Sequence, residues 1–212
     1  MGGVVEAMRR VAAGELANAF ALIGAGGHHA GRDFFGGYCC FNDVCIGIAE
    51  LRERGLGPRV AILDTDAHHG EGTRDIVQDD PAVLHACVCG TSFASADGTK
   101  LDLAVRWRAA SDPNDAYLET VRAVFPGACR AFRPDLLVWY FGFDGHRGDY
   151  CDMGLTAPCF LGLADLMVSL AAEAAGGRLV VVLGGGSRTD LATALIPPII
   201  ARLADAPRSA GA

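Results

Sequence analysis

The sequence predicts an α/β fold, a mainly parallel sheet flanked by helices on both faces in a three-layer sandwich. Apolar runs long enough for buried strands alternate along the chain with segments of helical periodicity. Of the 212 residues, 51% are hydrophobic and 20% are charged, which is enough apolar material for a sizeable core. Polar clusters follow the apolar runs, where parallel sheets place ligand sites. We expect one domain over residues 1–212.

Five apolar runs are typical of strands buried on both faces. The predicted strands cover residues 19–25, 59–65, 83–89, 135–143 and 178–186. Segments with helical periodicity lie between and after them. The predicted helices cover residues 41–54, 113–132, 157–176 and 188–205. The second has the clearest start, because Ser111, Asp112 and Pro113 precede its periodic residues.

Composition limits the function classes. A net charge of −7 argues against a general nucleic-acid binder, which needs a basic surface. We find no apolar run approaching the roughly 18 residues of a membrane span, so we expect no membrane partner. The eight cysteines contain no CxxC pair. They predict buried, reduced thiols in a cytoplasmic protein, and disfavour a disulfide scaffold or a thiolate metal site.

The stretch "LDTDAHHGEGT", residues 63–73, carries the strongest chemical signal. Asp64, Asp66 and His68 alternate along the chain, so an extended backbone directs them to one side. Buried carboxylates are costly unless a partner compensates their charge. Asp66, His68 and a carboxylate from another strand end would give three ligands with an open position, which is typical of catalytic zinc. Asp144, in "FGFDGH", is the candidate third ligand.

A second histidine pair, His28 and His29 in "GAGGHHAG", follows the first predicted strand. Imidazole titrates near neutral pH and can act both as a general base and as a general acid. Asp64 and Glu71 are then candidate carboxylates for orienting these rings. The glycine run in "VVLGGGS" lacks the ending and spacing of a phosphate-binding loop. It favours close approach of the backbone to a substrate or metal.

Four ordered blocks resemble the signature of the histone deacetylase superfamily, which includes bacterial and archaeal acetylpolyamine amidohydrolases. The blocks are "GGHHAGRDFFGGYCCFNDVCIGIA", "AILDTDAHHGEGT", "DLLVWYFGFDGHRGDY" and "VVLGGGS". The resemblance covers residues 18–195 and implies the arginase/deacetylase fold. A binuclear manganese ureohydrolase related to arginase would share this fold, but it would need an aspartate where His146 stands.

The resemblance implies a zinc-dependent amidohydrolase that splits an N-acyl amide, such as acetyl-lysine or an acetylpolyamine, into an amine and a carboxylate. Asp66, His68 and Asp144 match the zinc ligands. His29 matches the general base and acid, and His28 its electrostatic partner.

Further matches concern the surroundings of these residues. Asp64 matches a carboxylate that supports His28 and helps to hold a potassium ion. Gly37 and Tyr38 match the step that lines the acyl-lysine tunnel. Gly185 and Gly186 are further candidates for substrate binding.

Several positions depart from the family pattern. Ser187 stands where relatives have a tyrosine that donates to the developing oxyanion, so Arg188 or Tyr150 would have to replace it. The alternative is a weakly active or non-catalytic member that binds an acylated ligand. Glu71 replaces an aspartate or asparagine, and Cys87 replaces a potassium-binding serine. Few residues precede His28, so we expect a domain that lacks the usual N-terminal part.

Overall fold

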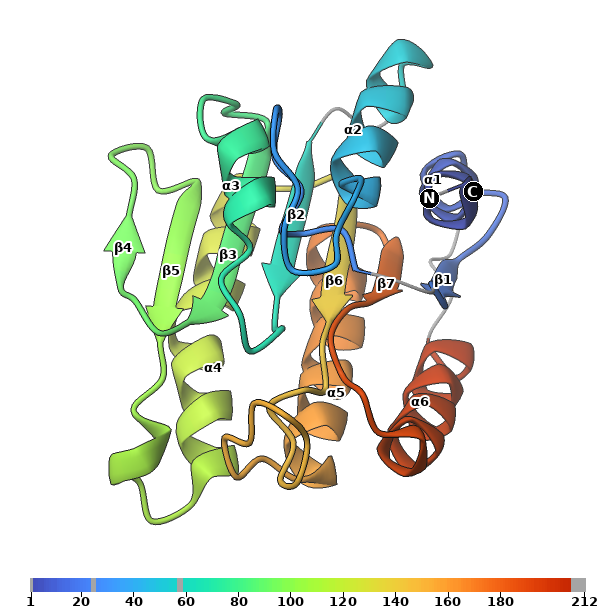
Figure 1. The fold of residues 1–212 in the computed structure, drawn as a ribbon. Helices are drawn as coiled ribbons and strands as arrows, with labels where there is room; N and C mark the ends of the chain where they lie inside the picture. The colour runs from blue at the N-terminus through green and yellow to red at the C-terminus, as the bar shows by residue number, and fades with distance from the viewer. Residues whose placement is uncertain (1, 24–25, 57–58, 207–212) are drawn as a thin grey trace.

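The computed structural model describes residues 2–23, 26–56 and 59–206 of the chain. Over these residues the strands form one seven-stranded sheet in the order β1-β7-β6-β2-β3-β5-β4 (Figure 1). The strands are β1 (Asn18–Ala21), β2 (Val60–Asp64), β3 (Val83–Cys89), β4 (Phe93–Ala94), β5 (Lys100–Ala104), β6 (Leu136–Phe141) and β7 (Leu179–Leu183). Neighbours pair in parallel, except for β4, which runs antiparallel to β5.

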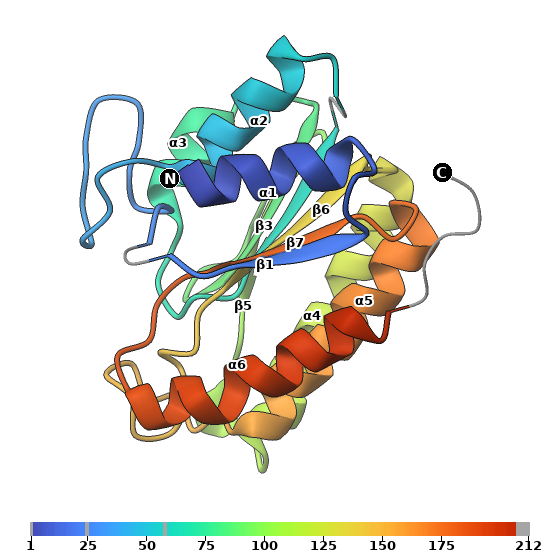
Figure 2. The same ribbon diagram turned by 90° about the vertical axis from the view of Figure 1, so that its right-hand side faces the viewer.

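Helices cover both faces of the sheet (Figure 2). One face carries α1 (Gly2–Ala12), α2 (Asp43–Glu53) and α3 (Glu71–Val77). The other carries α4 (Pro113–Phe132), α5 (Ala157–Ala174) and α6 (Thr189–Ala204), and a 3₁₀ turn, η1 (Trp107–Ala109), precedes α4. The predicted α/β fold with a mainly parallel sheet is therefore confirmed.

Each face of the sheet packs into its own apolar core. Along β2, Val60 and Ile62 belong to the core beneath α1 and α2, whereas Ala61 and Leu63 belong to the core beneath α4 and α5. Strands covered on both faces are apolar at consecutive positions, which is why β2 reads as an unbroken apolar run.

Most expected elements are present with small shifts of their ends. The strand expected at 83–89 and the helix expected at 113–132 have those bounds. The strand expected at 19–25 is found at Asn18–Ala21, and residues 24 and 25 lie outside the described part. The sequence analysis did not predict α1, α3, β4 or β5. In α1 the signal was present, because Val4, Met8 and Val11 form a buried stripe at helical spacing. The helix α3 has only 7 residues and the strand β4 only 2, which is too few to show a periodic pattern of apolar residues.

By length and composition alone, α5 is one helix among the described residues that could cross a membrane. The expectation that no run approaches this length was therefore wrong. Asp165 and Glu173 do interrupt the run, but both lie on its exposed side. The opposite side, with Phe160, Leu163 and Met167, is buried in the core beneath α4 and α6.

Gly72, in the first turn of α3, sets how closely this helix approaches the segment that carries His28 and His29. A Cβ atom at Gly72 would lie 2.4 Å from backbone atoms of His29 and Ala30. Backbone cannot move aside as a flexible side chain can, so we predict that Gly72→Ala lowers the free energy of unfolding by about 1–3 kcal/mol. Urea denaturation measures the effect.

Gly127 provides the matched control. It lies on the exposed side of α4, and a Cβ atom there meets nothing within 4 Å. Gly127→Ala should raise the free energy of unfolding by about 0.5–1 kcal/mol, because alanine favours the helix. Equal effects of the two substitutions would show that the contact at Gly72 is unimportant.

Candidate functional site

The segments that follow β1, β2, β6 and β7 gather at one edge of the sheet, on the left in Figure 2. All four strands are parallel, so their carboxyl ends meet there. A pocket of about 450 Å³ lies at this edge. Its lining includes His28, His29, Asp66, His68, Glu71, Tyr140, Tyr150 and Gly184–Gly186. The pocket is thus built from the four polar clusters that the sequence placed at strand ends.

Asp66, His68 and Asp144, the expected metal ligands, direct three donor atoms at one point. Nδ1 of His68 lies 2.9 Å from Oδ1 of Asp66 and 3.0 Å from Oδ2 of Asp144. The other oxygen of each carboxylate accepts a backbone hydrogen bond, from Gly185 to Asp66 at 2.6 Å and from Ala67 to Asp144 at 3.1 Å. These amides fix the carboxylates before any ligand binds.

The donor set fits a divalent cation. Asp66 is 2% exposed and Asp144 is fully buried. Among the described residues, Oδ2 of Asp144 has no hydrogen-bond partner, although Nδ1 of His68 lies 3.0 Å away, because one proton on Nδ1 cannot serve both Asp66 and Asp144. The carboxylates of Asp144 and Asp66 beside Nδ1 raise the pKa of His68 to about 11, as expected where two carboxylates favour positive charge. A metal cation would contact both carboxylates at once, whereas one proton on Nδ1 of His68 can be donated to only one of them.

Cys151 is a neighbour of this cluster that the sequence analysis missed. Its Sγ lies 3.1 Å from Nε2 of His68. Ligand atoms of His68, Asp144 and Cys151 lie within 4.8 Å of one another. No spacing signalled this residue, because the irregular loop between β6 and α5 brings it back to the site.

His28 is held in a buried pair with Asp64. Its Nδ1 lies 2.8 Å from Oδ2 of Asp64, and its ring stacks on Tyr140 at 4.7 Å between centroids. Burial alone would lower the pKa of His28, but the Asp64 carboxylate outweighs it and the pKa rises to about 9. The Asp64 carboxylate therefore favours the protonated form of His28, whose Nε2 lies 3.7 Å from Oδ1 of Asp66.

His29 stands at the rim of the same pocket and is oriented by Glu71. Nδ1 of His29 lies 2.7 Å from Oε2 of Glu71, so Nε2 is the ring nitrogen that this pair does not use. Gly37 packs against the ring, since a Cβ atom there would lie 2.1 Å from Cδ2 of His29. Tyr38 has a φ of 64° and a side chain that is 96% exposed, so it stands at the mouth of the pocket.

The glycine run lets the backbone approach the carboxylates. A Cβ atom at Gly185 would lie 2.4 Å from Oδ2 of Asp66, the atom to which the Gly185 amide donates. Gly186 has a φ of 130°, which only glycine adopts without strain. Both residues line the pocket.

Ser187 is turned toward Asp149, away from the pocket lining. Its hydroxyl donates to Oδ1 of Asp149 at 2.9 Å, and its amide donates to the same carboxylate. The side chain of Arg188 pairs with Asp190 at 2.6 Å. Tyr150 does line the pocket, and its ring stacks on His68 at 5.8 Å between centroids. Of the three candidate donors, Tyr150 is therefore the one that lines the pocket and contacts an expected metal ligand.

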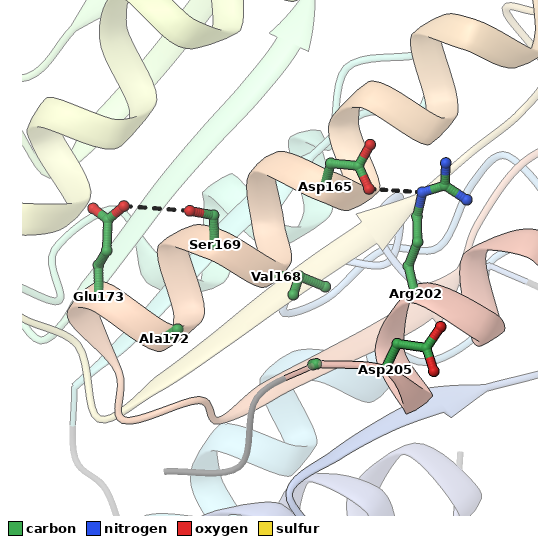
Figure 3. A pocket seen from close by; sticks show the side chains of 8 residues that line it. Asp165, Val168, Ser169, Ala172, Glu173, Arg202 and Asp205 are labelled. Atoms are coloured by element: carbon green, nitrogen blue, oxygen red, sulfur yellow. Dashed lines mark hydrogen bonds and ion pairs between the residues drawn. The ribbon is translucent and has the colours of Figure 1, made fainter.

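A larger pocket, of about 640 Å³, lies between α5 and α6 (Figure 3). Its lining includes Asp165, Ser169, Glu173 and Arg202, and Arg202 donates to Asp165 at 2.7 Å. Most of its lining residues lie on α5, and the others come from the end of α6 that is remote from the glycine run. It has none of the histidines described above.

Comparisons with known proteins place the chain in a family. The sequence model of the family described as "Histone deacetylase domain" matches residues 1–201. The chain is 32% identical to human histone deacetylase 9 over 205 residues and 31% identical to human histone deacetylase 7 over 204 residues. These matches cover 88% and 87% of this chain but only 20% and 21% of the two human proteins. The chain thus spans about a fifth of these relatives.

Solved structures agree with this fold. The HDA15 HD domain superposes with a TM-score of 0.82 at 25% identity, covering 96% of this chain and 61% of that one. Acetylpolyamine aminohydrolase from Burkholderia pseudomallei also gives a TM-score of 0.82, at 27% identity, covering 96% of this chain and 60% of that one.

Asp149 is a buried anchor for the residues after the glycine run. Backbone amides of Tyr150, Ser187 and Arg188 donate to its carboxylate. Burial alone would raise the pKa of Asp149, but these hydrogen bonds lower it below its usual value. We predict that Asp149→Ala costs about 1–3 kcal/mol of unfolding free energy at pH 7, because it leaves donors without partners.

The cost should depend on pH. A lowered pKa stabilises the fold above the unfolded value of about 3.9, and this contribution disappears as the pH falls through the folded pKa. Unfolding at pH 7 and pH 3 measures the difference, with the exposed Asp33→Ala as control. A cost that stays the same at both pH values would contradict the assignment.

Proposed function

Because the chain belongs to the histone deacetylase domain family, we propose that it is a zinc-dependent amidohydrolase that hydrolyses an N-acyl amide to an amine and a carboxylate. The observation that carries the proposal is the convergence of Asp66, His68 and Asp144 beside the His29–Glu71 pair in one pocket.

Asp66, His68 and Asp144 would hold the zinc ion through two carboxylate oxygens and one imidazole nitrogen. Zinc bound there supplies a Lewis acid that polarises the amide carbonyl and makes water a stronger nucleophile. The family also implies a potassium ion near Asp64. Potassium prefers hard oxygen ligands, so we leave the Cys87 thiol out of that set.

His29 would move the protons. Glu71 holds Nδ1 of His29, so Nε2 is available to take a proton from the attacking water and to give it to the leaving amine. Glu71 would also stabilise the protonated ring between these two transfers. His28, protonated beside Asp64, supports Asp66 electrostatically and transfers no proton in this scheme.

We assign the oxyanion donor to Tyr150. Burial, together with the charges of Asp144 and Asp66, raises the pKa of Tyr150, so its hydroxyl stays protonated and can donate. Ser187 occupies the position at which relatives have their tyrosine, but its hydroxyl already donates to Asp149. A phenol supplied from another loop would replace that function.

The substrate is proposed only as a class, an acylated amine such as acetyl-lysine or an acetylpolyamine. Histone deacetylases and an acetylpolyamine aminohydrolase are both among the similar proteins. The exposed Tyr38 at the pocket mouth would contact the amine chain, next to Gly37. The eight cysteines are free thiols, which supports the proposal of a cytoplasmic location.

The alternative is a family member that binds an acylated ligand but turns it over weakly or not at all. The position of Ser187 is the observation that favours it. Turnover of a fluorogenic acyl-lysine substrate separates the two functions, since metal binding is common to both.

We predict that Asp66→Ala and Asp144→Ala each contain one equivalent of zinc less than the wild-type protein. Each substitution removes one of three ligands from a buried cluster. Elemental analysis after dialysis measures the metal, with the exposed Asp190→Asn as control. If both ligand variants keep the wild-type metal content, the ligand assignment is wrong.

We expect His29→Ala to lose about 10²–10⁴-fold in kcat while it keeps its zinc, because His29 transfers protons and holds no metal. Single-substrate kinetics and metal analysis on the same sample provide the test. A variant with bound zinc and wild-type turnover would rule out this role.

Tyr150→Phe should lower kcat/KM on acetyl-lysine by about 10²–10³-fold, the usual cost of losing one oxyanion donor. A trifluoroacetyl substrate has an electron-poor carbonyl and needs less help, so the ratio of trifluoroacetyl to acetyl turnover should rise. The assignment fails if Ser187→Ala produces these changes and Tyr150→Phe does not.

A further inference from the structure

A second group of potential metal ligands lies beside the first. Ligand atoms of His69, Cys87, Cys89 and Asp102 all lie within 4.8 Å of one another. The proposed hydrolysis uses none of these four side chains. Two thiols, an imidazole and a carboxylate form a softer donor set than that of the first site.

The fold brings these residues together on rigid elements. Cys87 and Cys89 are two positions apart on β3, so their side chains share one face of the sheet. Asp102 on β5 is the register partner of Cys87, which places these two side chains next to each other. His69 reaches them from the loop between β2 and α3. The sequence analysis looked for CxxC spacing and therefore disfavoured a thiolate site, whereas a strand needs CxC.

The donors are buried and incompletely satisfied. Cys87 is fully buried, Cys89 is 7% exposed and Asp102 is 9% exposed. Nδ1 of His69 is buried and has no hydrogen-bond partner in the described part of the chain, although it lies 3.8 Å from Oδ1 of Asp102. A cation bound among these four side chains would satisfy this buried imidazole nitrogen.

The charges balance for a divalent ion. Arg74 donates to Oδ1 of Asp102 at 2.7 Å and compensates that carboxylate. Two thiolates would then compensate the two charges of the metal. The Thr91 hydroxyl lies 3.4 Å from Sγ of Cys89 and 3.4 Å from Oδ2 of Asp102, so both ligands have an outer partner.

We propose that His69, Cys87, Cys89 and Asp102 form a second metal site, for zinc or a similar thiolate-binding divalent cation. Four protein ligands without an open position are typical of a structural zinc. Zinc–ligand distances of about 2.0–2.3 Å place tetrahedral ligand atoms roughly 3.3–3.8 Å apart, so the cluster needs to contract little.

Such a site would stabilise the loop that carries His68. His69 follows His68 directly, and the Gly70 amide donates to Sγ of Cys87 at 3.4 Å. A pocket of about 490 Å³ that Cys89 lines gives an ion a path from solvent. The second ion would therefore position the first site without contacting the substrate.

Cobalt substitution tests the proposal on the full chain. Thiolate-bound Co²⁺ has a near-ultraviolet charge-transfer band that oxygen and nitrogen ligands do not give. We expect two cobalt equivalents and this band in the wild-type protein. Cys89→Ser should lose one equivalent and most of the band, whereas the exposed Cys40→Ser should lose neither. Asp66→Ala should keep the band with one equivalent, which separates this site from the proposed catalytic one.

His69→Gln provides a second variant that perturbs the core less, and it should also lose one equivalent. The proposal is overturned if the wild-type protein shows no thiolate band. It is also overturned if Cys89→Ser and His69→Gln retain both equivalents, or if non-reducing peptide mapping finds Cys87 and Cys89 joined in a disulfide in the metal-treated protein.

Discussion

The burial of Asp66 and Asp144 side by side, just beyond the ends of β2 and β6, is the constraint on which the rest of the site depends. Two adjacent carboxylates in the interior repel each other and lose their hydration. One oxygen of each carboxylate accepts a hydrogen bond from a backbone amide, Gly185 for Asp66 and Ala67 for Asp144. Nδ1 of His68 lies between the two remaining oxygens. Within the described residues, Oδ2 of Asp144 nevertheless has no hydrogen-bond partner. That leftover need for positive charge is the physical reason for placing a metal ion here.

The surrounding backbone is shaped by the same pair. A Cβ atom at Gly142 would lie 2.7 Å from Cα of Asp66, and one at Gly185 would lie 2.4 Å from Oδ2 of Asp66. Strand β6 and the glycine run can approach the carboxylates only because these positions lack side chains. Asp149 then fixes the chain after the glycine run through the amides of Ser187 and Arg188. Residues far apart in the sequence thus fix the positions of the two carboxylates together.

How much could be predicted from the sequence follows from these contacts. The β3 and α4 ranges were predicted because unbroken apolar runs and helical periodicity are local signals. The expected clusters meet because parallel strands end at one edge. The sequence did not predict the contacts that Asp149, Tyr150 and Cys151 make, because these contacts depend on the path of an irregular loop. The partnership of Cys87 with Asp102 depends on the register of β3 and β5, which no local pattern reveals.

The central claim is that the buried carboxylates and His68 bind a metal ion. Crystals of the protein purified with zinc, measured on both sides of the zinc absorption edge, test it directly. The account predicts an anomalous peak within bonding distance of Asp66, of Nδ1 of His68 and of Asp144. A well-ordered site without such a peak, with Nδ1 of His68 hydrogen-bonded to Asp66 in its place, would contradict it.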